Sequence, residues 1–322
     1  MSTLRFDLPC PDISMWRQGN TGTEGVWHFD SGRRGRHVLI SALVHGNELC
    51  GAWAIKGLLE AGIRPAEGQL TLMLANLAAF DRFDEANHDA SRFVDEDMNR
   101  QWMDDRFIDP STLERKRVVE LAPWVSQADW LLDLHSMHEP GPPLSLTGLQ
   151  PRNLQFAQEL ANPAHIVVDA GHKNGVRLRD YGRFGQPDEE APETRSILIE
   201  CGFHGDVASL DVARDMCSRF LVLAGVLDES ELHAMLPSWK QADVPERWVL
   251  QVTGGVVAYS DRFRFEKPYQ NLEIIANAGT VIGDNDGQPV TTPYDDCVLI
   301  MPSVRQARAG VTVVRFARST RF

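Results

Sequence analysis

The sequence contains few cysteines, and their spacing excludes two common kinds of site. Five cysteines occur in 322 residues, at positions 10, 50, 201, 217 and 297. None of them forms a Cys-x-x-Cys pair. An odd number of cysteines without paired spacing argues against a disulfide framework and against a zinc site built from thiolates.

The chain also lacks long apolar runs and a positive balance of charge. No stretch approaches the roughly 20 apolar residues that cross a bilayer, and the opening MSTLRFDLPCPD has no basic or apolar signal region. A net charge of −13 disfavours nucleic acid and anionic membranes as partners, although the local field of a cavity can still suit a small anion. We expect a cytoplasmic protein that binds a small molecule, and its oligomeric state stays open, with a homo-oligomer among the alternatives.

Short apolar runs alternate with longer amphipathic segments over the first 240 residues. The apolar runs are too continuous for a half-exposed sheet, so we expect buried strands at 38–44, 70–75, 130–134, 166–168 and 196–199. We expect helices at 48–61, where Gly62 is a suitable C-cap, and at 113–125 and 210–227. This alternation predicts an α/β domain at 1–240 with a mixed, largely parallel central sheet flanked by helices.

The pattern of residue types changes after residue 245. Residues 248–322 contain β-branched residues separated by turn signals such as GG, NAG and GDNDGQP, which predicts a small all-β domain at 245–322. Part of this segment resembles lipoyl-like barrel-sandwich domains. Those carriers require an acceptor lysine, and residues 268–322 contain none. We therefore expect a structural domain that caps the pocket.

Three of the apolar runs end in a residue whose side chain can bind a metal ion or transfer a proton. The first ends at His45, with Glu48 one helical turn further on, WLLDLH ends at His135, and RSILIE ends at Glu200. In open α/β sheets ligands bind outside the carboxyl ends of the strands. Two imidazoles and a carboxylate with one position left open form the usual ligand set of catalytic zinc. We expect one Zn²⁺ per chain at His45, Glu48 and His135, with Glu200 left over as a base.

Two neighbouring residues bear on this assignment. Asp133 lies two residues before His135, on the same face of a strand, and its carboxylate is suited to orient the imidazole. His138 competes with His135 as a ligand, but it lies beyond the strand in MHEPGPP.

A second group of polar residues occurs in RFVDEDMNR, at 92–100. Its mixed charges are compatible with a solvated loop. Arg92, Asn99 and Arg100 are nevertheless suited to anion recognition, because guanidinium groups bind carboxylates through two hydrogen bonds and an amide adds a directional donor.

The order of HGNE, RFVDEDMNR, DLHS and ILIECG resembles the aspartoacylase and succinylglutamate desuccinylase family, within the zinc carboxypeptidase superfamily. The resemblance covers about residues 36–225, and the β domain fits the architecture of the family. It implies a zinc carboxypeptidase-like fold in which His45, Glu48 and His135 hold the metal. It also implies that Glu200 acts as general base and acid, that Arg92 polarises the scissile carbonyl, and that Asn99 and Arg100 hold a substrate carboxylate.

The sequence departs from the family pattern at two points. Aspartoacylases carry a further substrate arginine before the catalytic glutamate, and here Arg195 is available at a shorter spacing. They also contribute a tyrosine from the β domain, for which Tyr259, Tyr269 and Tyr294 are alternatives. The acyl group and the amino acid of the substrate therefore stay open.

These observations predict a zinc-dependent hydrolase that removes an acyl group from an N-acyl amino acid. A carboxypeptidase acting on short peptides would use nearly the same ligands and base. A non-catalytic binding module is the third alternative, but such a module is expected to have lost a ligand or the base, and this chain retains all four residues.

Overall fold

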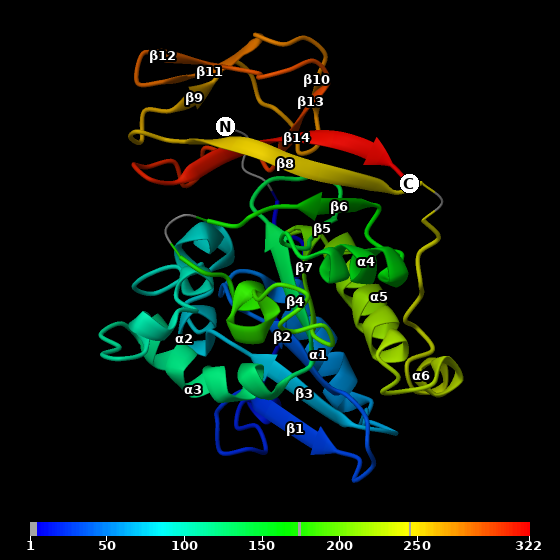
Figure 1. The fold of residues 1–322 in the computed structure, drawn as a ribbon. Coiled ribbons are helices and arrows are strands. Elements are labelled where there is room, and N and C mark those ends of the chain that lie inside the picture. The colour runs from blue at the N-terminus through cyan, green and yellow to red at the C-terminus, as the bar shows by residue number, and fades with distance from the viewer. Residues whose placement is uncertain (1–4, 173–174, 245) are drawn as a thin grey trace.

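One large mixed sheet organises the molecule (Figure 1). The computed structural model describes residues 5–172, 175–244 and 246–322. The sheet contains 11 strands in the order β1-β3-β2-β4-β7-β5-β6-β8-β14-β13-β10. Its first seven strands in the chain are β1 (Val26–Asp30), β2 (His37–Ala42), β3 (Gln69–Leu74), β4 (Trp130–Met137), β5 (Leu144–Leu146), β6 (His165–Val168) and β7 (Arg195–Phe203).

The middle of this sheet is parallel, as the sequence predicts. β2 pairs in parallel with both β3 and β4, and β4 pairs in parallel with β7. β1 and β5 run antiparallel to their neighbours β3 and β7. The carboxyl ends of β2, β4 and β7 therefore meet at one edge of the sheet.

Helices cover both faces of the parallel part. The α-helices are α1 (Leu49–Glu60), α2 (Leu77–Phe80), α3 (Leu113–Gln127), α4 (Pro151–Leu160), α5 (Ala208–Leu223) and α6 (Glu229–Met235). The short 3₁₀ helices are η1 (Ser14–Trp16), η2 (Glu85–Ser91), η3 (Met98–Arg100), η4 (Asp104–Arg106), η5 (Leu178–Asp180) and η6 (Gly182–Phe184). Helices α1, α4 and α5 pack on one face, and α3 packs on the other.

Alternation along each strand explains why its apolar run is continuous. Val38 and Ile40 of β2 join the core beneath α1 and α5, whereas Leu39 packs with Val118 and Leu121 of α3 on the opposite face. Successive side chains of a strand point to opposite faces, so a strand covered on both faces needs apolar residues throughout. All six residues of β2 are buried.

The predicted helix 48–61 ends as expected. Gly62 follows the last turn of α1 with a φ of 69°, and its N–H donates to the carbonyl of Leu59. A left-handed residue at this position is favourable for glycine, which has no Cβ.

Two strands extend further than their apolar runs. β4 continues past His135 to Met137, and β7 continues past Glu200 to Phe203. The reason is that backbone pairing between β4 and β7 does not depend on the polarity of the side chains, so the ladder includes His135 opposite Glu200. Hydrophobicity alone placed the strand ends too early.

Among the described residues 246–322, every regular element is a strand. These strands are β8 (Trp248–Val257), β9 (Arg264–Phe265), β10 (Ile274–Ile275), β11 (Val281–Asn285), β12 (Gln288–Thr291), β13 (Cys297–Ile300) and β14 (Thr312–Arg321). β8 pairs in parallel with β6 and antiparallel with β14, so the main sheet continues into this segment. Strands β9, β11 and β12 form a separate small sheet.

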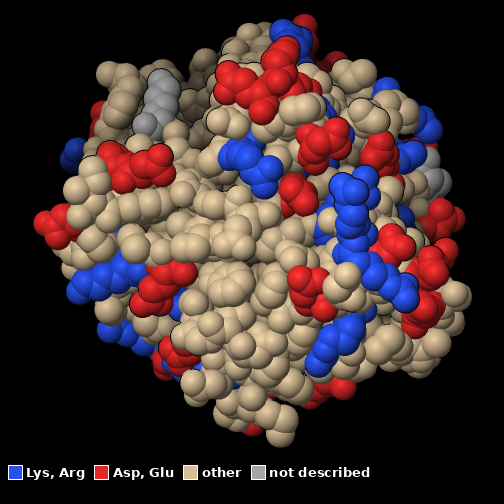
Figure 2. Space-filling model, turned by 60° about the horizontal axis from the view of Figure 1, so that its bottom comes forward, with Lys and Arg blue, Asp and Glu red and all other residues tan. Residues whose placement is uncertain are grey.

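The surface carries charges of both signs. On the face shown in Figure 2, acidic and basic side chains alternate around a central uncharged area. No helix in the described part of the chain is long and apolar enough to cross a membrane.

Candidate active site

The three residues predicted as metal ligands converge at the carboxyl edge of the sheet. His45 follows β2, Glu48 immediately precedes α1, and His135 lies in β4. One ligand atom from each lies within 4.8 Å of the others, and all three side chains are buried. His45 Nδ1 lies 2.7 Å from Glu48 Oε1, and His135 Nδ1 lies 2.8 Å from Glu48 Oε2.

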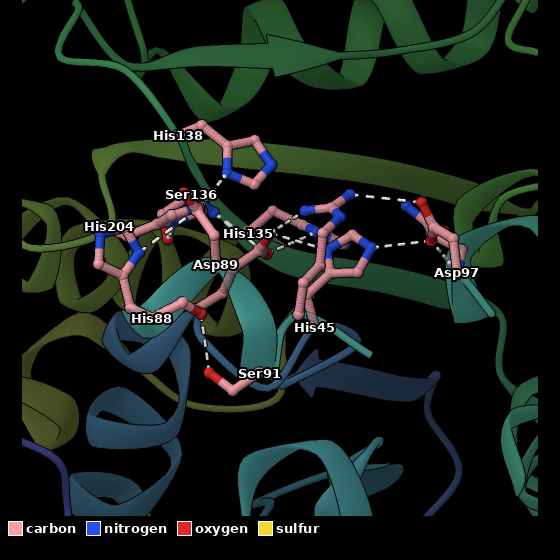
Figure 3. Close-up of polar contacts among 12 residues, drawn as sticks. His45, His88, Asp89, Ser91, Asp97, His135, Ser136, His138 and His204 are labelled. Atoms are coloured by element: carbon pink, nitrogen blue, oxygen red, sulfur yellow. Dashed lines mark hydrogen bonds and ion pairs between the residues drawn. The ribbon is translucent and has the colours of Figure 1, made fainter. Parts of the chain in front are cut away.

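The outer nitrogen of each imidazole is anchored by a carboxylate. His135 Nε2 lies 2.9 Å from Asp133 Oδ2. His45 Nε2 lies 2.9 Å from Asp97 Oδ1 (Figure 3). Carboxylates only accept hydrogen bonds, so each Nε2 carries a proton and each Nδ1 faces Glu48. Metal-binding histidines are commonly held in this way. Asp133 has the position predicted from the sequence, whereas the role of Asp97 was not foreseen.

The electrostatics of the cluster favour a bound cation. Burial alone would raise the pKa of Glu48, but the imidazoles of His45 and His135 hold it well below its usual range. Burial would lower the pKa of His135, but Asp133 and Glu48 hold it well above its usual range. Two imidazole nitrogens and a carboxylate that converge in a buried space fit the ligand set of zinc.

The backbone between the ligands is tightly constrained. Leu43 has a left-handed φ of 58°, which turns the chain directly after β2. A Cβ on Gly46 would lie 2.4 Å from the Ser91 carbonyl oxygen and 2.4 Å from the carbonyl carbon of Ala79. Only glycine therefore fits between His45 and the residues that follow it.

Glu200 lies beside the cluster on β7. Its backbone is opposite His135 in the ladder between β4 and β7, so the two side chains share a face of the sheet. Burial, reinforced by the negative charge of Glu48, raises the pKa of Glu200 to about 8. Its Oε2 has no hydrogen-bond partner among the described residues. A half-buried carboxyl group with a buried, unpaired oxygen and a pKa near neutrality is suited to proton transfer.

Arg92 directly follows η2, and its side chain reaches the cluster of predicted metal ligands. Its Nη1 lies 3.2 Å from Glu48 Oε1, and its Nη2 lies 3.4 Å from Asp97 Oδ2. The guanidinium is therefore held next to the ligand cluster, and Arg92 lines the same cavity.

Asn99 and Arg100 belong to η3, on the Asp97 side of the cluster. Asn99 Oδ1 accepts a hydrogen bond from the Leu178 N–H at 2.9 Å, so the amide group of its side chain keeps its donors available. Burial lowers the pKa of Arg100 to about 10, although Asp97 opposes this effect. Arg100 still carries its charge at neutral pH.

Two further arginines, not anticipated from the sequence, complete this side of the site. Arg177 Nη1 lies 3.4 Å from Asp169 Oδ2, and Arg315 Nε of β14 lies 3.2 Å from the same oxygen. With Arg100 they line one cavity, and we refer to Arg100, Arg177 and Arg315 as the arginine wall. Arg100 lies 3.7 Å from Asp97, Arg177 pairs with Asp169 and Asp180, and Arg315 pairs with Asp169, so three carboxylates face the three guanidinium groups.

All of these groups open into one cavity of about 240 Å³. His45, Glu48, Arg92, Asn99, Arg100, His135 and Glu200 line it. His138 also lines it but is not part of the three-residue ligand cluster. Met301 and Arg315 contribute from the C-terminal strands and their loops, so this segment forms part of the cavity wall.

Arg195 lies away from the cavity. It begins β7, five residues before Glu200, and at about 3.3 Å per residue this spacing corresponds to roughly 16 Å. Its guanidinium donates to the carbonyls of Pro192 and Thr194. The structure thus places the arginine nearest in sequence to Glu200 at the opposite end of the strand.

The three tyrosines considered from the sequence are also outside the cavity lining. Tyr259 is exposed, Tyr294 bonds Thr253 through its hydroxyl, and Tyr269 packs against Phe265. Among the described residues, no tyrosine lines the cavity.

Comparisons with known proteins agree with this architecture. Residues 34–183 match the family model described as the succinylglutamate desuccinylase/aspartoacylase catalytic domain. A search of curated proteins found no match.

Solved structures show the same fold at low sequence identity. Succinylglutamate desuccinylase from Vibrio parahaemolyticus aligns with a TM-score of 0.64 and 16% identity over 92% of this chain and 86% of that one. An ectoine utilization protein from Ruegeria pomeroyi, solved with bound product, aligns with a TM-score of 0.62 and 17% identity over 88% and 85% of the two chains. Murine aminoacylase 3 aligns with a TM-score of 0.57 and 21% identity over 90% and 97%.

These similarities extend over nearly the whole fold, and the family model covers the segment that carries three of the four motifs. Residues 34–183 therefore belong to the succinylglutamate desuccinylase/aspartoacylase catalytic domain family, which confirms the resemblance seen in the sequence.

Proposed function

We propose that the protein is a zinc-dependent hydrolase that cleaves the amide bond of an N-acyl amino acid or a related small acidic substrate. One observation carries the proposal. The cluster of His45, Glu48 and His135 lies beside Glu200 in a cavity whose other side is the arginine wall. This arrangement supports the roles of metal ligands, base and anion site around one small space.

The ligand residues fit one zinc ion per chain. A zinc ion held by His45, Glu48 and His135 supplies a Lewis acid that polarises a carbonyl and lowers the pKa of water. Asp97 and Asp133 keep the two imidazoles in the orientation and tautomer that binding requires.

Glu200 and Arg92 perform the remaining steps at the scissile amide. In its ionised form Glu200 takes a proton from the attacking water and then gives it to the leaving amine nitrogen. Arg92 lies against Glu48 and stabilises the oxyanion that develops from the carbonyl. A well-placed donor of this kind typically contributes about 3 kcal/mol to transition-state stabilisation.

The arginine wall defines the acidic end of the substrate. Arg100 and the Asn99 amide hold the carboxylate next to the scissile amide, because a guanidinium and a directional donor match that group. Arg177 and Arg315 line the same cavity and offer further guanidinium donors to an acidic substrate.

A carboxypeptidase remains the alternative function, since its chemistry needs the same ligands and base. The cavity of about 240 Å³ is lined on one side by Met301 and Arg315 of the C-terminal segment. This restricted space supports a small substrate over a peptide chain.

A substrate panel distinguishes the two functions. The protein is loaded with zinc and assayed for amine release from N-acyl amino acids and from short peptides with free C-termini. We expect turnover of N-acyl amino acids and little turnover of peptides. Preferential cleavage of peptides would establish the carboxypeptidase, and no turnover of either class would refute the proposal.

A further inference from the structure

His138 occupies the side of the cavity away from the arginine wall. It directly follows β4 and lines the cavity. Figure 3 shows His138 and Asp97 on opposite sides of His45. Asp97 neighbours Arg100, so His138 and the carboxylate site lie on opposite sides of the reacting centre.

The His138 ring is held in place through one nitrogen. Its Nδ1 lies 3.0 Å from Asp89 Oδ1 and 3.3 Å from His204 Nε2. His204 is fully buried, and its Nδ1 lies 2.7 Å from Ser136 Oγ. Asp89 is also 3.6 Å from Arg305. These contacts fix the position of a side chain that no step of the proposed reaction uses.

The tautomer of His138 follows from these contacts. The hydrogen bond with His138 is the main cause that lowers the pKa of Asp89 to about 2, so Asp89 is an ionised acceptor. His138 Nδ1 must therefore carry the proton that it shares with Asp89. Burial lowers the pKa of His138, which keeps the ring neutral and leaves a lone pair on Nε2. No described residue forms a hydrogen bond with Nε2.

The proposed substrate orientation brings its acyl group to this side. If Arg100 holds the carboxylate and Arg92 faces the scissile carbonyl, the acyl group points away from the arginine wall. Arg305 offers little free charge there, because its Nε lies 2.7 Å from Glu139 Oε1. Arg308, which also lines the cavity, is exposed to solvent.

We propose that His138 selects the acyl group of the substrate, and that this group is short, uncharged and carries a hydrogen-bond donor that His138 Nε2 accepts. Asp89 acts as a positioning residue that sets the direction of Nε2. This inference rests on the proposed deacylase function and adds the chemical class of the acyl group to it.

The test compares two acyl groups of equal size on the same amino acid. Zinc-loaded protein is assayed with the N-glycolyl form, which ends in a hydroxyl, and with the N-propionyl form, which ends in a methyl. The hydroxyl also changes the intrinsic reactivity of the amide. The readout is therefore the change in the glycolyl-to-propionyl ratio of kcat/KM when His138 is replaced.

In His138→Phe we expect this ratio to fall about tenfold, the effect of one well-formed hydrogen bond, while the propionyl substrate is still hydrolysed. His172→Phe is the matched control, because His172 lines the cavity beside Arg315 and should leave the ratio unchanged. Asp89→Asn should lower the ratio about threefold, since the amide holds the ring less firmly. If His138→Phe does not fold, the ratio in Asp89→Asn tests the role of His138.

Three outcomes would overturn the inference. The first is an unchanged ratio in His138→Phe, or in Asp89→Asn if His138→Phe does not fold. The second is faster hydrolysis by the parent of the N-succinyl form, whose acyl group is charged, than of the N-glycolyl form. The third is an equal fall of the ratio in His172→Phe. If N-acyl amino acids are hydrolysed, these results remove only the role of His138. No hydrolysis of any N-acyl amino acid removes the proposed function as well.

Discussion

Replacing Glu200 by glutamine tests the proposed base and its unusual environment together. The pKa of Glu200 is raised from 4.5 to about 8, first by burial and then by the charge of Glu48. Between these two values the folded protein binds a proton that the unfolded chain has lost. The stabilisation from this proton is complete below pH 4.5 and is lost as the pH rises through 8.

The magnitude follows from the two pKa values. A pKa difference of about 3.5 corresponds to about 5 kcal/mol in total, of which about 4 kcal/mol falls between pH 5 and pH 8.5. The metal-free parent should lose this contribution to its free energy of unfolding over that interval. Glu200→Gln cannot titrate and should not lose it. Glu193→Gln, at an exposed glutamate that precedes β7, is the matched control and should behave like the parent.

Activity provides the second readout of the same variant. Glu200→Gln should retain zinc but lower kcat by about 100-fold or more, the usual contribution of a general base. In the parent, kcat/KM should rise with pH as Glu200 loses its proton, and this limb should be absent in the variant. The assays are denaturant unfolding of chelated protein at the two pH values, elemental analysis and steady-state kinetics. Identical pH dependence of parent and variant, or unchanged turnover, would refute the reasoning.

The remaining predictions concern the metal site and the arginines. Asp133→Asn should weaken zinc binding about 10- to 100-fold in a chelator competition, because His135 loses its anchor; equal affinity would exclude this role. Arg100→Ala should lower kcat/KM on the free acid by about 100-fold or more and much less on the carboxyl amide, with partial rescue in Arg100→Lys; an equal loss on both substrates would contradict a carboxylate contact. Arg315→Ala should weaken acidic substrates more than neutral ones, seen as a rise in KM, and a uniform effect would count against it. Arg195→Ala should change kcat/KM by less than about twofold, and a larger loss would return Arg195 to the site.

The parallel sheet and the residues at its edge were accessible from the sequence. The buried strands are apolar on both faces, so their runs are easy to recognise, and a polar residue at the end of such a run stands out. His45, His135 and Glu200 are of this kind. The same rule predicts ends of β4 and β7 that are too early, because it considers the polarity of the side chains and not the pairing of the backbone.

The rest of the cavity depends on contacts between distant parts of the chain. Arg177 directly precedes η5, and Arg315 lies in β14, 215 residues after Arg100. Nothing in the local sequence marks either residue, since arginines on strands and loops are usually exposed. Arg195 illustrates the opposite error, in which proximity along the strand to Glu200 suggested proximity in space.

The interpretation of the β segment shows the same limit. Its strands were expected from turn signals and β-branched residues, and the described residues 246–322 form strands. β8 extends the main sheet because it pairs with β6. The two strands are far apart in the sequence, and neither local sequence indicates this pairing. This pairing is what brings Arg315 to the arginine wall.

The most direct test of the account is a zinc titration with paired substrates. Chelated protein receives increasing zinc and is assayed with an N-acyl amino acid and with the same compound amidated at its carboxylate. We predict that hydrolysis of the free acid is absent without metal, rises linearly and reaches a plateau at one zinc per chain, while the amidated form remains a poor substrate throughout. Hydrolysis that persists without metal, or equal rates on the two forms, would contradict the proposed zinc-dependent cleavage of N-acyl amino acids.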